Sequence, residues 1–210
     1  PIINFPEISM WGLYPWGGWG ATALPERFTR LWSQASRILS GGFLYSEGIY
    51  EDMNKAVVSQ LYWYGEADWR ETLRQYARYE LGIADAADFI EMISLFEKTQ
   101  SDVVEKGFCD TALFDSAFEL AKQLDEKLPA WAKKTWRWRI IYLRALIDAH
   151  RYNMARALNT QTRWNDIKWK ELLAENASVQ AAFREIISLF HCAEKDGDDP
   201  YHCRVRPRCE

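Results

Sequence analysis

Two short segments near the N-terminus bring together carboxylates, aromatic rings and glycines, the residue types that bind and cleave sugars. The first, 4–20, contains Glu7 among several indole rings, and the second, 42–55, contains Glu47 close to Tyr45. In glycoside cleavage one carboxylic acid protonates the leaving oxygen while a second carboxylate acts as nucleophile or base. Flat aromatic faces suit the C–H faces of a sugar ring. The pattern therefore indicates a carbohydrate site.

The candidate catalytic residues are Glu47 and then Glu7, because each carboxylate directly follows a short apolar strand. A parallel barrel presents its functional groups at that end of its strands. The candidate substrate-binding residues are rings and polar groups of the same segments: Trp11, Trp16, Trp19, Tyr45, Asp52 and Asn54. An acidic residue after a strand is also often a helix cap or a surface charge. The run from Glu51 to Lys55 likewise reads as a solvated helix face with an i,i+4 ion pair.

The elements that must position these residues are two strand–helix units followed by helices. Segments 2–5, 8–11 and 43–45 are compatible with short strands, and a glycine-rich loop follows the first two. Pro25 opens a helix that Gly41 and Gly42 close, and a second helix starts near Ile49. Apolar residues at helical spacing then predict helices over 68–81, 85–107, 110–128 and 129–158, and a last one from about 165 to 192.

These elements predict a mainly α chain, with a bundle of about five helices preceded by two short strand–helix units that resemble the end of a (β/α)8 barrel. We expect the last βα units of a truncated barrel-like domain over 1–64, a helical bundle over 65–195 and an irregular tail over 196–210. A complete barrel needs about 250 residues. Since the chain opens on Pro1 rather than Met, we expect a processed or truncated piece of a longer protein.

The strings NFPEISMWG, PWGGWGA, GGFLYSEGIYEDMNKA and LPAWAKKTWRWRIIYLRALIDAHR resemble the C-terminal part of large bacterial glycoside-hydrolase-like proteins. In these proteins a (β/α)8 barrel is followed by a helical domain, as in hexosaminidases and α-glucuronidases. The resemblance implies that the segments around Glu7 and Tyr45 are the last loops of a sugar site. It also implies that the other barrel strands are missing and that this chain alone is inactive.

Composition excludes several other classes of function. The 26 basic and 30 acidic residues give a net charge of −4, which argues against a nucleic-acid partner. Arg137, Arg144 and Arg151 share one helix face, which we interpret as solvated or packed against acidic neighbours. No apolar run approaches the length of a membrane span. The expected partners are a carbohydrate and the remainder of the barrel, with no nucleic acid or membrane.

The cysteines and histidines of the tail do not form a recognisable metal site. His191, Cys192, His202, Cys203 and Cys209 lack a C-x-x-C pair, so a disulfide or free thiols are favoured over zinc, and no cofactor is expected. The sequence therefore favours part of a glycoside hydrolase or carbohydrate-binding protein. The alternative is a non-catalytic helical interaction or carbohydrate-binding domain with an aromatic N-terminal arm.

Overall fold

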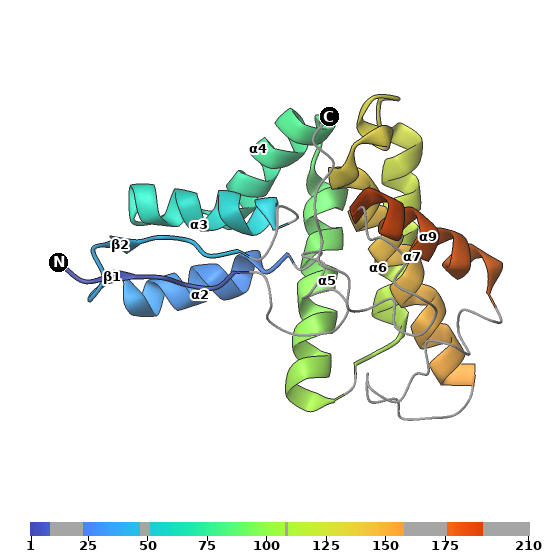
Figure 1. Cartoon of the computed structure of the whole chain (residues 1–210), viewed down its shortest axis with the longest axis horizontal. Coiled ribbons are helices and arrows are strands. Elements are labelled where there is room, and N and C mark those ends of the chain that lie inside the picture. Colours follow the sequence, from blue (N-terminus) through green and yellow to red (C-terminus); the bar gives the residue numbers. More distant parts are fainter. Residues whose placement is uncertain (9–22, 47–50, 108, 158–175, 191–210) are drawn as a thin grey trace.

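The computed structural model describes residues 1–8, 23–46, 51–107, 109–157 and 176–190, and in this part of the chain the fold is mainly helical, as predicted. Figure 1 shows a short strand pair beside α2 and α3 at the N-terminal end of the molecule, with longer helices beyond it. The elements in chain order are β1 (Ile3–Asn4), α2 (Pro25–Ala35), β2 (Gly41–Gly42), α3 (Asp52–Tyr64), α4 (Trp69–Leu81), α5 (Ala87–Lys106), α6 (Ala112–Lys127), a 3-10 turn (Ala132–Lys134), α7 (Trp136–Ala157) and α9 (Ala177–Phe190).

The two strands run parallel to each other. Ile3 lies opposite Gly41 and Asn4 opposite Gly42, and a further parallel bridge joins Glu7 to Tyr45. Parallel strands cannot be joined by a tight turn, so the chain crosses over between them through α2. The predicted order of strand, helix, strand and helix is therefore present at the N-terminal end. The prediction that Gly41 and Gly42 close the helix is wrong, because α2 ends at Ala35 and the two glycines form β2.

Helices α2 and α3 pack together, and α3 packs against one face of the strand pair. The rings of Trp32 and Tyr62 lie 4.6 Å apart, and the Tyr62 hydroxyl donates a hydrogen bond to Asn4 Oδ1 at 2.7 Å. A Cβ on Gly42 would lie 2.0 Å from that same Asn4 oxygen and 2.9 Å from the Tyr62 ring. Only glycine fits at this position, because any side chain would displace the hydrogen-bonded pair.

The boundaries of the middle helices follow from local capping residues. Asp68 accepts a hydrogen bond from the backbone N–H two residues later at 2.9 Å, and Gly82 ends α4 in the left-handed conformation with φ +69°. Asp85 and Asp110 accept equivalent bonds at 3.1 and 3.0 Å just before α5 and α6. The sequence predictions for the starts of these helices are confirmed.

The predicted helix from Pro129 to about residue 158 is interrupted near its start. Thr135 is extended, with ψ 145°, and separates the 3-10 turn from α7. Its Oγ1 accepts a hydrogen bond from the Trp138 N–H at 3.3 Å, so Thr135 acts as the N-cap of a new helix. Trp138 is fully buried, whereas Trp136, the first residue of α7, is half-buried.

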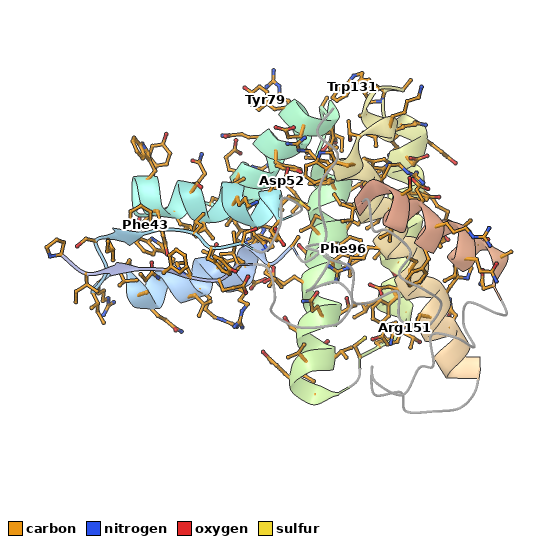
Figure 2. The ribbon with its side chains drawn as sticks, in the orientation of Figure 1. Phe43, Asp52, Tyr79, Phe96, Trp131 and Arg151 are labelled. Carbon is orange, nitrogen blue, oxygen red and sulfur yellow. The ribbon has the colours of Figure 1, made fainter. Side chains whose placement is uncertain are left out.

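The prediction of a solvated arginine face on α7 is wrong for Arg144 and Arg151, which are each 1% exposed. Helices α6 and α9 both pack against α7 and leave little of its surface open (Figure 2 labels Arg151). The Arg144 guanidinium lies 3.4 Å from Asp148, donates to Gln100 Oε1 at 2.9 Å and sits 4.7 Å from the Phe96 ring. Packing against an acidic neighbour, the other interpretation, is confirmed for Arg144.

Candidate functional site

The candidate residues that the structure describes lie where the two strands end and α3 begins. Glu7 and Tyr45 form the last parallel bridge, and Asp52 and Asn54 belong to the first turn of α3. The remaining candidates lie outside the described residues, so their roles stay predictions: Trp11, Trp16, Trp19 and Glu47. Histidines and cysteines of the tail, beyond residue 190, also lie outside.

The two candidate segments leave the strand pair side by side. Tyr45 N–H donates to the Pro6 carbonyl at 2.9 Å, and Ile8 N–H donates to the Tyr45 carbonyl at 3.0 Å. The rings of Phe5 and Tyr45 lie 5.5 Å apart on the face opposite α2 and α3. Strand alternation places Glu7 on that same face, opposite Tyr45 in the parallel bridge.

A single buried side chain holds both ends of the tryptophan-bearing segment. Asn54 Nδ2 donates to the Ile8 carbonyl at 2.9 Å, and Asn54 Oδ1 accepts from the Leu24 N–H at 2.9 Å. Ile8 is the last described residue before 9–22 and Leu24 is the N-cap of α2. Asn54 therefore closes this segment at its base. Its predicted contact with a substrate stays a prediction.

A side-chain hydrogen bond also joins the two residues that flank the second segment. The Ser46 hydroxyl donates to Glu51 Oε2 at 2.6 Å, and these two residues flank 47–50. The Glu51 side chain is 2% exposed, and Lys55 Nζ lies 3.9 Å from it. The predicted ion pair is confirmed, but the prediction that this run is a solvated face is wrong for Glu51 and for Asn54, which are both buried.

Burial raises the pKa of Glu51 above its ordinary value, and the nearby Glu7 carboxylate adds to the rise. The hydrogen bond from Ser46 and the charge of Lys55 act in the opposite direction. The Glu7 carboxylate therefore lies close enough to act on Glu51 at the carboxyl end of the strand pair. Sequence reasoning did not select Glu51, because its i,i+4 partner made an exposed position the simpler interpretation.

Asp52 connects the start of α3 to the helical part of the molecule (Figure 2). Its carboxylate accepts a hydrogen bond from Arg137 Nε at 2.6 Å and from the Tyr76 hydroxyl at 3.0 Å. Burial raises the pKa of Asp52, while the arginine and the hydroxyl oppose that rise. Glu80 lies 3.2 Å from the same Arg137 nitrogen. The predicted role of Asp52 in substrate binding is not tested by these contacts.

Glu97 of α5 holds the start of α2 in a comparable way. Its two carboxylate oxygens accept hydrogen bonds from the backbone N–H groups of Glu26 at 2.9 Å and Arg27 at 2.6 Å. Carboxylates are stabilised at such positions by the orphan N–H groups of the first turn. Glu97 of α5 thus anchors α2, the helix that follows the first candidate segment. Tyr76 of α4 and Arg137 of α7 anchor α3, the helix that follows the second.

Comparison with protein-family models, with characterised proteins and with solved structures finds no match to this chain. No cluster of three or more metal-binding side chains occurs within the described ranges. None of the helices in those ranges is long and apolar enough to cross a bilayer. The evidence for function therefore comes from the geometry at the strand ends.

Proposed function

We propose that this chain forms part of a carbohydrate-active protein, in which the segments after β1 and β2 line a sugar site for glycoside hydrolysis or binding. The proposal includes an arrangement of β1, α2, β2 and α3 as the end of a (β/α)8 barrel. In such barrels the helices lie outside, and functional groups gather at the carboxyl ends of the strands. The packing of α3 on one face of the pair, and of α2 against α3, supports this arrangement.

The observation that carries the proposal is that both segments start from adjacent strands and are closed by residues of the same helix end. Asn54 bonds to Ile8 and Leu24, while Glu51 bonds to Ser46. When the two ends of a loop are already fixed, the loop loses less conformational entropy on binding a ligand. This geometry favours a shared site for the carboxylates and rings of the two segments.

In the proposed site Glu47 and Glu7 are the candidate acid and nucleophile or base. Glycoside cleavage requires one carboxyl group that keeps its proton and another that is ionised. Tyr45 and the tryptophans of 9–22 would stack on the sugar ring. Glu51 is a positioning residue, since its carboxylate is buried and engaged with Ser46.

The proposal is tested with the polypeptide encoded by the complete open reading frame, assayed on a panel of α- and β-linked aryl glycosides. Glu47→Gln and Glu7→Gln should each lower kcat by about 100-fold or more, the usual contribution of a general acid or base. Trp16→Ala should weaken oligosaccharide binding by about tenfold, measured by calorimetry and tryptophan fluorescence.

The matched control is Glu66→Gln, which changes an exposed carboxylate between α3 and α4. Turnover and binding should be unaffected by that variant. If Glu47→Gln, Glu7→Gln and Trp16→Ala all leave turnover and sugar binding unchanged, the carbohydrate assignment is wrong. The chain is then better described as a helical interaction domain.

A further inference from the structure

The outward face of the strand pair is unusually apolar for a surface. Ile3 is 58% exposed, Phe5 67% and Phe43 66%, and Tyr45 lies beside Phe5 on the same face (Figure 2 labels Phe43). The opposite face is covered, because Asn4 contacts Tyr62 of α3. Side chains of each strand point to the two faces in turn, and apolar residues on both faces are typical of a parallel sheet that is covered on both sides.

The outer edge of β1 is open as well. The hydrogen bonds to the second strand use main-chain groups of Ile2, Asn4, Pro6 and Ile8, as in Phe43 N–H to Asn4 O at 2.9 Å. Strand geometry directs the main-chain groups of Ile3 and Phe5 to the other side. Within the described residues these outward groups form no hydrogen bond.

We infer that β1 is an internal strand of a larger parallel sheet, and that a further strand of the same polypeptide pairs in parallel with its outer edge. That strand would accept and donate hydrogen bonds at Ile3 and Phe5, and its neighbours would cover the apolar face. Purely parallel sheets are found almost only with both faces covered. The inference extends the barrel arrangement included in the proposed function, by naming the edge at which the next strand pairs, and does not depend on the sugar chemistry.

A second copy of this chain fits the same edge less well. Two copies related by a two-fold axis would place β1 against β1 in antiparallel orientation, because a two-fold contact is self-complementary. The established pair is parallel and already has its crossover helix on one face. Continuation of the same ladder by a parallel strand therefore agrees better with the observed register.

Amide hydrogen exchange of the 210-residue chain and of the polypeptide from the complete open reading frame tests the inference. The Ile3 and Phe5 amides should exchange about 100-fold more slowly in the complete polypeptide, since opening of a paired strand limits their exchange. The Tyr45 amide, which donates within the pair, is the internal reference. Equal exchange of Ile3 and Phe5 in both proteins would overturn the inference.

A pair of variants tests the apolar face independently. Phe5→Asp should lower Tm by less than about 2 °C in the 210-residue chain, because the ring is exposed there, and by about 5 °C or more in the complete polypeptide. Trp63→Asp, at an 82% exposed position on α3, should have only a small effect in both. Equal small effects of Phe5→Asp in both proteins contradict the inference. Concentration-dependent dimers with protected Ile3 and Phe5 amides would instead assign the edge to a second copy.

Discussion

At the scale of single residues, the polar side chains around the strand ends mainly organise the backbone. Asn54 joins two main-chain groups that lie sixteen positions apart in sequence, Ile8 and Leu24. Both of its amide atoms are used in the only orientation that matches a carbonyl acceptor and an N–H donor. Substitutions at such residues should therefore affect stability before they affect any chemistry.

Asn54→Leu should destabilise the chain by about 2–4 kcal/mol, because it leaves two buried main-chain groups without their partner. The free energy of unfolding, measured by urea denaturation, checks this value. Ser59→Ala, at an exposed position of the same helix, is the control and should change stability by less than about 0.5 kcal/mol. Equal stability of the Asn54 variant and wild type would show that the two loop ends are held in another way.

Gly42→Ala should destabilise the chain by about 1–3 kcal/mol, the usual cost of overpacking. The new Cβ would meet Asn4 Oδ1 and the Tyr62 ring, so the bond between these two residues would have to break or shift. Thermal unfolding provides the measurement, and Ser40→Ala at an exposed neighbouring position is the comparison. An unchanged Tm for Gly42→Ala would mean that the strand pair does not lie this close to α3.

At the scale of elements, the starts of α2 and α3 depend on side chains that are distant in sequence. Glu97 accepts hydrogen bonds from the first turn of α2, although about 70 positions separate them. Leu24 at the N-cap offers no side-chain acceptor of its own. A neighbouring helix thus supplies the cap that the local sequence lacks.

Burial raises the pKa of Glu97 from 4.5 to about 7, so the folded chain binds more protons than the unfolded chain between these values. Stability should therefore fall as pH rises through this window, by about 3 kcal/mol in total for this group. Glu97→Gln should remove that part of the pH dependence. Urea denaturation between pH 4.5 and 8 gives the two stability profiles.

Subtracting the Glu97→Gln stability profile from the wild-type profile isolates the contribution of Glu97 from those of the other titrating groups. Burial lowers the pKa of His150, which makes stability rise with pH. Burial raises the pKa of Glu51 and of Asp52, which makes stability fall with pH, as for Glu97. Glu91→Gln, at an exposed position of α5, is the matched control variant. Parallel profiles for wild type and Glu97→Gln would contradict the assignment.

At the scale of the whole molecule, an ion pair between distant helices joins the strand–helix units to the rest within the described residues. Arg137 of α7 contacts Asp52 of α3, and their side chains are 30% and 20% exposed. The predicted division into residues 1–64 and 65–195 stays a prediction. The contacts of α3 with α4 and α7 nevertheless tie these two regions together.

Arg137→Met should destabilise the chain by about 2–4 kcal/mol, because it leaves the Asp52 carboxylate largely buried without its cation. It should also raise the pKa of Asp52 further, which NMR titration of the carboxyl carbon measures. The comparison is Arg74→Met, which removes an exposed ion pair with Glu71 and should cost less than about 1 kcal/mol. Similar effects of the two variants would show that the Arg137 pair behaves as a surface contact.

Much of the helical architecture could be predicted because its signals are local. Asp68 and Gly82 mark the two ends of α4, and Asp85 and Asp110 precede the next two helices. The candidate site was predicted less completely. Glu51 was taken as solvated because helical spacing reports a neighbour such as Lys55 but not the Ser46 hydroxyl that covers it.

By itself, the sequence determined the helical class, the order of the N-terminal elements and most helix starts, since capping and periodicity act over a few residues. Only the tertiary structure decided that Arg144 and Arg151 are buried, that Asn54 ties Ile8 to Leu24 and that Glu97 caps α2. Each of these depends on contacts between elements far apart in the chain. Periodicity identifies a face of a helix, but the neighbours that pack on it determine whether that face meets water.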